Sequence, residues 1–317
     1  MKTACLLFSG LLVMLHSPAT ASEVQGEIVI FHAGSLAVPL QEIARAFESE
    51  HPGARVRREA AGSRHSARKI SDLGRACDVM ASADYAVIDT LLIPVHAAWN
   101  IKFAANEMVI AFTDKSRYAN EINQDNWHGI ILRPEVACGR SDPNADPCGY
   151  RTILTAKLAE KKYGVHGFTE NLLAKDWRFM RPKETDLLAL LATETIDYIF
   201  IYRSVAMQHG LRFLTLPDEI NLKRDDLAEH YASVAVEISG AEPGNTITRV
   251  GEPMIYSVTI PHNAPNPNAA LAFVAFLLDA DKGIAIMEKN GQPGVVPSVS
   301  TTYHAIPKPL KPYATAP

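Results

Sequence analysis

The stretch Ile28-Val29-Ile30-Phe31-His32-Ala33-Gly34-Ser35-Leu36 decides the fold of this chain. Its first residues are apolar and predict a buried strand, and the Gly34-Ser35 turn leads directly into an amphipathic helix over residues 36–50. Such a turn directs backbone N–H groups, a hydroxyl and the positive end of a helix dipole toward one point. The turn is therefore a candidate anion site, although a Gly-Ser pair can also serve only to begin a helix.

Two further turns follow the same plan. Ala60-Ala61-Gly62-Ser63-Arg64 comes after an alternating strand pattern and opens a helix, and Ser82-Ala83-Asp84-Tyr85 comes after a short apolar strand. In an open α/β sheet, ligands bind beyond the carboxyl ends of the strands. We therefore expect the three turns to meet at one edge of a cleft and to hold a small oxyanion with neutral donors.

Strand and helix patterns alternate along the whole chain, which predicts an α/β protein with mostly parallel sheets and helices on both faces. The pattern restarts after Thr113, and another apolar strand covers residues 253–261. These observations predict two lobes with a ligand cleft between them. The first comprises residues 22–113 with 253–306, the second comprises residues 114–252, and residues 307–317 form a flexible tail.

The first residues predict export. Lys2 precedes an apolar run over residues 4–15, and Ala19-Thr20-Ala21 has the small residues of a cleavage site. The apolar run is shorter than the ~20 residues that a membrane span requires. We therefore expect residues 1–21 to be a cleaved signal peptide and the mature protein to lie in the periplasm.

Composition and motifs exclude several classes of function. The net charge of −4 provides no basic field for nucleic acid. The histidines lack a metal-binding spacing, and neither a C-x-x-C pair nor a G-x-S-x-G turn occurs, so neither an enzyme nor a cofactor is predicted. Cys77 lies in an apolar run, whereas Cys138 and Cys148 flank a turn-rich loop and either form a short disulfide or stay free.

Six segments, in order along the chain, resemble the archaeal-type tungstate/molybdate-binding proteins, which are the extracytoplasmic receptors of ATP-driven importers. They are His32-Ala33-Gly34-Ser35-Leu36, Gly62-Ser63, Ala81-Ser82-Ala83-Asp84-Tyr85, Asn106-Glu107-Met108-Val109-Ile110-Ala111-Phe112, Asp146-Pro147-Cys148-Gly149-Tyr150-Arg151 and Leu216-Pro217-Asp218-Glu219-Ile220-Asn221-Leu222. The resemblance covers most of the mature chain. It implies a monomeric receptor with a type II periplasmic-binding fold, which closes on tungstate or molybdate and delivers it to a permease.

The resemblance also assigns roles to individual residues. It implies that Ser35 and Ser63 donate their hydroxyls to the oxyanion, with nearby backbone N–H groups beside them. Asp146 matches a carboxylate that approaches the metal centre from the second lobe, although it could instead cap the following helix. Tyr231 matches a tyrosine that hydrogen-bonds the oxyanion or is a packing residue. The oxyanion-binding set expected from sequence is Ser35, Ser63, Asp146, Tyr231, Gly34 and Ser82.

One position departs from the family pattern. The pattern carries a second carboxylate just before the tyrosine of the strand near residue 198, whereas this chain has Ile201 there. An isoleucine cannot bind a metal, so we expect tetrahedral recognition with at most one carboxylate near the metal.

Two other functions stay open. The first is a receptor for another tetrahedral oxyanion, such as sulfate, which the radius of the cleft would separate from tungstate. The second is a periplasmic enzyme on the same fold, which would need a nucleophile and a base across the cleft. A ferric-ion receptor is a weaker variant, because it would need tyrosines and carboxylates where the Gly-Ser turns lie.

Overall fold

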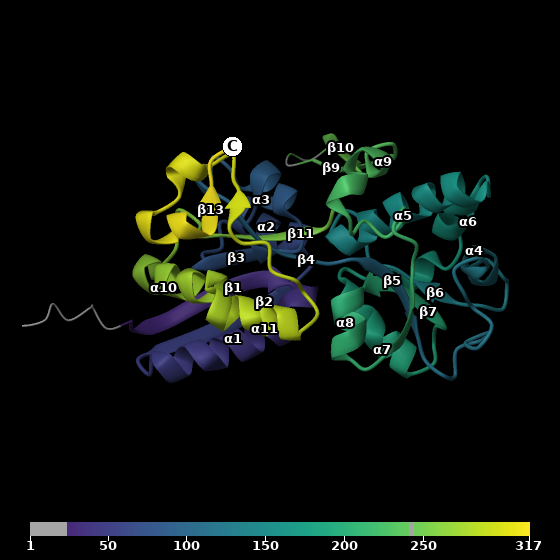
Figure 1. The fold of residues 1–317 in the computed structure, drawn as a ribbon, viewed down its shortest axis with the longest axis horizontal. Helices are drawn as coiled ribbons and strands as arrows, with labels where there is room; N and C mark the ends of the chain where they lie inside the picture. Colours follow the sequence, from purple (N-terminus) through teal and green to yellow (C-terminus); the bar gives the residue numbers. More distant parts are fainter. Residues whose placement is uncertain (1–23, 241, 243) are drawn as a thin grey trace, which may run out of the picture.

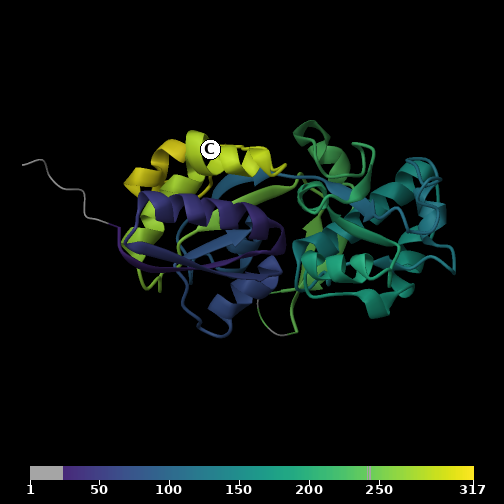
Figure 2. The same cartoon turned by 90° about the horizontal axis from the view of Figure 1, so that it is seen from below.

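The computed structural model describes residues 24–240, 242 and 244–317. The expected signal peptide lies outside the described residues. Two lobes lie side by side, each built around its own sheet, as Figures 1 and 2 show from two directions. None of the helices in the described part of the chain combines the length and the apolar character that a membrane crossing requires.

The first lobe contains a five-stranded sheet in the order β2-β1-β3-β11-β4. Its strands are β1 (Gly26–Ala33), β2 (Ala54–Ala61), β3 (Val79–Ser82), β4 (Ile101–Ala105) and β11 (Ile255–Thr259). Its helices are α1 (Ala37–Glu50), α2 (Ser63–Ser71), α3 (Tyr85–Leu91), α10 (Pro267–Leu278) and α11 (Ala285–Lys289). The apolar face of α1 packs against α10, where Phe47 makes edge contacts with Phe273 and Phe276.

The second lobe contains a four-stranded sheet in the order β6-β7-β5-β8. Its strands are β5 (Met108–Phe112), β6 (Cys138–Gly139), β7 (Tyr198–Tyr202) and β8 (Arg212–Thr215). Its helices are α4 (Trp127–Ile131), α5 (Pro147–Tyr163), α6 (Phe168–Ala174), α7 (Leu187–Ala192), α8 (Arg203–Gln208) and α9 (Ala228–Tyr231). A two-stranded hairpin, β9 (Ala235–Ser239) and β10 (Thr246–Val250), leads back toward the first lobe.

Short helical turns complete the fold. They are η1 (Gly34–Leu36), η2 (Trp177–Phe179), η3 (Glu184–Asp186), η4 (Asp225–Leu227), η5 (Ala280–Ile284), η6 (Tyr303–Ala305) and η7 (Lys308–Tyr313).

The sheets are mixed rather than mostly parallel, which corrects the prediction. β1 runs parallel to β2 and β3, and β6 runs parallel to β7. β11 is antiparallel to β3 and β4, and β5 is antiparallel to β7 and β8. The difference arises at the crossings, because a strand that arrives from the other lobe can enter its sheet in either direction.

The chain leaves the first sheet earlier than expected. β5 pairs with β7 and β8 of the second sheet, so the crossing lies between Ala105 and Met108 and not near Thr113. The return lies between Val250 and Ile255. A wholly apolar strand such as β5 contains no sign of which sheet it joins, and this explains the misplaced boundary.

The expected flexible tail is ordered, which is a second correction. η7 and strand β13 (Ala314–Thr315) follow one another, and β13 pairs in parallel with β12 (Ser298–Val299). Leu310 is fully buried in the first lobe. The segment is therefore a helical turn followed by a short strand, and Leu310 anchors it to the first lobe.

Candidate oxyanion site

Both Gly-Ser turns of the first lobe lie in contact with the second lobe. A side chain at Gly34 would place its Cβ 2.8 Å from Thr185 Oγ1 and 3.1 Å from Glu184 Oε2. A side chain at Gly62 would place its Cβ 2.3 Å from the carbonyl oxygen of Ala145. Only glycine allows such a close approach. The lobes are therefore closed over these turns.

The second and third turns meet, as the sequence predicts. Ser63, the first residue of α2, is fully buried, and its Oγ accepts a hydrogen bond of 2.9 Å from the N–H of Ala83. The Ser82 hydroxyl is engaged within its own turn, where it donates to the carbonyl oxygen of Asp84 at 2.6 Å and accepts from the Asp84 N–H at 3.1 Å. The Ser82 hydroxyl therefore stabilises its own turn. The Ser63 hydroxyl only accepts a hydrogen bond, so its proton is available for a ligand.

Ser35 lies in η1, directly before α1, and is buried. Its Oγ accepts a hydrogen bond of 3.1 Å from the phenol of Tyr256, which lies on β11. The side-chain amide of Gln292 donates to the carbonyl oxygen of Ser35 at 3.0 Å. Both the side chain and the backbone of Ser35 are thus held by the first lobe.

Asp146 approaches the same turns from the second lobe. It lies directly before α5 and is 1% exposed, and its Oδ2 accepts a hydrogen bond of 2.9 Å from the N–H of Glu184. Its other carboxyl oxygen, Oδ1, has no hydrogen-bond partner among the described residues. The side chain makes no capping bond to α5. The arrangement thus leaves one carboxyl oxygen of Asp146 unsatisfied in the interior.

Glu184 is a second carboxyl at this place, besides Asp146. The residue is fully buried at the start of η3, and neither carboxyl oxygen has a donor within the described part of the chain. Burial, and then the neighbouring Asp146, raise its pKa well above the usual value. Burial also raises the pKa of Asp146. Two unsatisfied carboxyls at one buried point form an unusual group, since most buried polar atoms have partners.

Ile201, where the family pattern led us to expect a carboxylate, is a core residue. It pairs with Val109 in the middle of the second sheet and is fully buried. The second carboxyl is therefore supplied by the loop before α7 and not by β7. The sequence around Glu184 is a short polar run before an apolar helix, and an acidic residue in the first turn of a helix is too common to mark a site.

The structure does not bring Tyr231 to this place. Its phenol donates to the carbonyl oxygen of Asp218 and accepts from the N–H of Arg224, within the second lobe. Tyr202, at the end of β7, is the tyrosine nearer the interface between the lobes. Its phenol accepts a hydrogen bond of 3.1 Å from Arg151, which also donates to the carbonyl oxygen of Ala83 at 2.7 Å. Tyr202 is absent from the oxyanion-binding set expected from sequence, because an apolar strand by itself indicates only packing.

A charged cluster holds the lobes together beside the turns. The buried Asp84 of the first lobe accepts a hydrogen bond from Tyr150 of the second, and its Oδ2 lies 3.2 Å from Arg249 and 3.9 Å from Arg151. Burial alone would raise the pKa of Asp84, but Arg249 and Arg151 hold it below its ordinary value. Asp84 is therefore charged, and its contacts bridge the two lobes.

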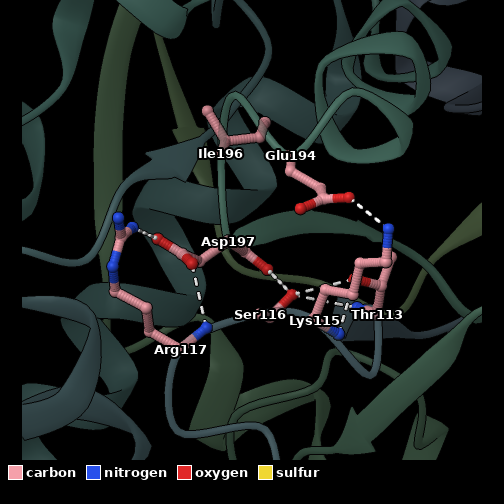
Figure 3. Close-up of a pocket in the computed structure, with 7 residues that line it drawn as sticks. All are labelled: Thr113, Lys115, Ser116, Arg117, Glu194, Ile196 and Asp197. Atoms are coloured by element: carbon pink, nitrogen blue, oxygen red, sulfur yellow. Dashed lines mark hydrogen bonds and ion pairs between the residues drawn. The ribbon is translucent and has the colours of Figure 1, made fainter.

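A separate pocket of about 140 Å³ opens in the second lobe, and Figure 3 shows its lining. Its charged side chains already pair, with Lys115 on Glu194 at 2.5 Å and Arg117 on Asp197 at 2.8 Å. Its seven lining residues are Thr113, Lys115, Ser116, Arg117, Glu194, Ile196 and Asp197. None of them belongs to the three turns.

The three cysteines of the described residues, Cys77, Cys138 and Cys148, are buried and free. A disulfide between Cys138 and Cys148 is therefore not formed. The two residues lie on different elements, β6 and α5, and the thiol of Cys148 is directed to the carbonyl oxygen of Phe200 at 3.6 Å.

The chain is similar to known solute-binding proteins over most of its length. The profile of the family described as bacterial extracellular solute-binding protein matches residues 28–292. An uncharacterized solute-binding protein of Petrotoga mobilis is 52% identical over 292 residues, which cover 92% of this chain and 91% of that protein. The molybdate/tungstate-binding protein WtpA of Pyrococcus abyssi is 40% identical over 312 residues, which cover 90% of this chain and 89% of that protein.

Solved structures share the architecture at low sequence identity. The periplasmic molybdate-binding protein of Azotobacter vinelandii has a TM-score of 0.62 at 15% identity, covering 84% of this chain and 98% of that one. The sulfate-binding protein SubI of Mycobacterium tuberculosis has a TM-score of 0.62 at 13% identity, covering 85% and 87%. These similarities confirm the predicted type II periplasmic-binding fold. Together with the family profile, they show that the chain belongs to the bacterial extracellular solute-binding proteins.

Proposed function

We propose that this protein binds molybdate or tungstate between its lobes and delivers it to the permease of an ATP-driven importer. The observation that supports this cargo most directly is the buried carboxyl pair Asp146 and Glu184, which adjoins the turn at Gly34-Ser35. The name of the Pyrococcus abyssi relative supports the same cargo.

Neutral donors of the first lobe meet the oxygens of the anion. Ser35 and Ser63 each accept one hydrogen bond from the protein, so their hydroxyl protons are available to a ligand. The N-terminal N–H groups of the helices that begin at these turns add partial positive charge. Gly34 contributes its backbone, since its lack of a side chain lets the lobes approach.

The carboxyl pair distinguishes among tetrahedral anions. A carboxylate beside a dianion is repelled unless it is protonated or contacts an electron-poor centre. The metal centre of molybdate or tungstate can accept additional oxygen ligands, whereas the sulfur of sulfate cannot. Asp146 and Glu184 would therefore approach the metal of a bound oxyanion, and this arrangement favours molybdate and tungstate over sulfate.

Delivery depends on lobe closure. Contacts from both lobes stabilise the closed state, because the turns of the first lobe and the carboxyls of the second adjoin only there. The rims of the closed lobes would dock the permease. We further propose that the protein acts as a monomeric periplasmic receptor after loss of its signal peptide, that it has no catalytic activity, and that it needs no cofactor besides its cargo.

A thermal-shift series tests the cargo. The protein from Ser22 onward is heated with tungstate, molybdate, sulfate or phosphate, and calorimetry then measures the affinities. A ligand at ~100 times its Kd adds about 2.7 kcal/mol of stability, which raises the melting temperature by several degrees. We expect shifts with tungstate and molybdate and none with sulfate. A shift with sulfate alone would replace the cargo, and no shift with any oxyanion would contradict the receptor function.

A further inference from the structure

The side chain of Asn106 lies at the crossing between the lobes, and its orientation is determined by two backbone donors. Its Oδ1 accepts from the N–H of Glu107 at 2.9 Å and from the N–H of Ser204 at 3.3 Å. Only the amide oxygen can accept these bonds, so Nδ2 must occupy the other position. Nδ2 then donates to the phenol of Tyr256 at 2.8 Å and to Ser204 Oγ at 2.7 Å.

The orientation of Asn106 also fixes the direction of the hydrogen bond between Tyr256 and Ser35. An amide nitrogen can only donate, so the phenol oxygen accepts from Asn106, and its single proton is left for Ser35 Oγ at 3.1 Å. Tyr256 is fully buried, and burial raises its pKa to about 12. The phenol therefore keeps its proton at any physiological pH and cannot act as a charged acceptor.

Ser35 is the end of the chain of hydrogen bonds. Its oxygen accepts from Tyr256, and in the described residues this is the one hydrogen bond of its hydroxyl group. The hydroxyl proton must then point away from Tyr256. Hydrogen bonds in series polarise one another in the same direction, so each donor in this chain strengthens the next.

We propose that Asn106 and Tyr256 are positioning residues that set Ser35 as a donor to the bound oxyanion and make this setting depend on lobe closure. The inference rests on the proposed function, because it assigns Ser35 to the anion. Asn106 joins the two lobes, since Tyr256 lies on β11 of the first and Ser204 on α8 of the second. The series of hydrogen bonds from Ser204 through Asn106 and Tyr256 to Ser35 is therefore complete when the lobes are closed.

A double-mutant cycle tests the proposal, with tungstate as the probe and calorimetry as the measurement. Tyr256→Phe removes only the phenol hydroxyl, and we expect it to weaken binding about tenfold. In a Ser35→Ala background, the same change should alter the affinity less than about twofold, because the chain acts through Ser35. In a Ser63→Ala background, the tenfold loss should persist.

The controls separate positioning from a general effect on structure. Tyr198→Phe removes another fully buried phenol, which donates to the carbonyl oxygen of Arg117 in the second lobe, and it should leave the affinity unchanged. A loss for Tyr256→Phe that is equally large with and without Ser35 would overturn the proposal, since a structural defect would not depend on Ser35. No loss at all would overturn it too.

Asn106→Asp is the second variant, and it decides the question if Tyr256→Phe does not fold. A carboxylate can still accept the two backbone N–H groups but cannot donate to Tyr256. The phenol would then donate to the introduced carboxylate and leave Ser35, so we expect a loss of at least about tenfold that disappears in the Ser35→Ala background. Unchanged affinity in Asn106→Asp would overturn the proposal.

Failure of the proposed cargo gives a different result. If the wild-type protein binds sulfate and not tungstate, the cargo is wrong, and the same cycle with sulfate decides the role of the chain. If it binds no oxyanion, both proposals are overturned, because the Ser35 hydroxyl then has no anion to which it donates.

Discussion

Glu184 donates its backbone N–H to the carboxylate of Asp146, 38 residues earlier, at 2.9 Å, and its own carboxyl lies against Gly34 of the opposite lobe. Three of the four carboxyl oxygens of this pair lack a hydrogen-bond donor among the residues that the structure describes. Unsatisfied buried carboxyls destabilise a protein. A group that lowers stability at the meeting point of two lobes indicates a binding role.

Glu184→Gln should separate stability from binding. The change removes a buried acid whose pKa is raised by burial, so the ligand-free variant should be more stable than the wild type by about 1–3 kcal/mol. Tungstate should then raise its melting temperature less than that of the wild type. Glu194→Gln is the matched control, because Glu194 is half exposed and pairs with Lys115. An unchanged tungstate shift in Glu184→Gln would remove Glu184 from the binding group.

Loss of both serine hydroxyls should abolish the anion site. Ser35→Ala combined with Ser63→Ala removes the two available donors and leaves the turns intact, because the glycines are unchanged. Each alanine leaves one protein donor without its acceptor, so we expect a stability loss of about 1–3 kcal/mol per position. Calorimetry with tungstate should detect no binding in the folded double variant. Wild-type affinity in that variant would show that the anion binds elsewhere.

The buried His32 should make the protein sensitive to acid. Burial lowers its pKa from 6.5 to about 4, and the side chain is hydrogen-bonded to the carbonyl oxygen of Ala33 at 2.7 Å. As the pH falls from about 6.5 to about 4, the unfolded chain takes up a proton on this residue before the folded chain does. The free energy of unfolding therefore decreases as the pH falls through this range.

The measurement compares urea unfolding at pH 7.5 and 4.5 in the wild type and in His32→Asn, whose amide can keep the bond to Ala33. The wild type should lose about 2–3 kcal/mol more than the variant over this interval. His166→Asn, at an exposed histidine, should behave like the wild type. Equal pH dependence in the wild type and His32→Asn would contradict the burial argument.

The cysteines should behave as three buried thiols. Burial raises the pKa of Cys77 and of Cys138 to about 12 and raises that of Cys148 well above the ordinary range. An alkylating reagent should therefore modify none of them in the native protein and all of them after unfolding, as intact mass would show. A reducing agent should not change the melting temperature. If two of the thiols resist alkylation after unfolding without reductant, a disulfide is present and this prediction is wrong.

Local chemistry allowed much of the fold to be predicted from sequence. The strand ending at Ala33, the Gly34-Ser35 turn and the helix after it follow from apolar periodicity and turn residues within a few positions, and so does the second turn at Gly62-Ser63. The convergence of the second and third turns followed from a general property of open sheets. These features depend on neighbours in the chain, so the sequence contains the information directly.

Other features were decided by contacts between distant segments. The sheet that β5 joins, the packing of the tail at Leu310 and the burial of Glu184 depend on which surfaces meet after folding. The positions of Tyr202 and Tyr256 have the same origin, since each lies in an apolar strand whose pattern indicates only burial. The sequence alone therefore determined the turns that can meet an anion. Only the tertiary structure decided which carboxyls and phenols face them, because burial and hydrogen-bond direction arise when the lobes pack together.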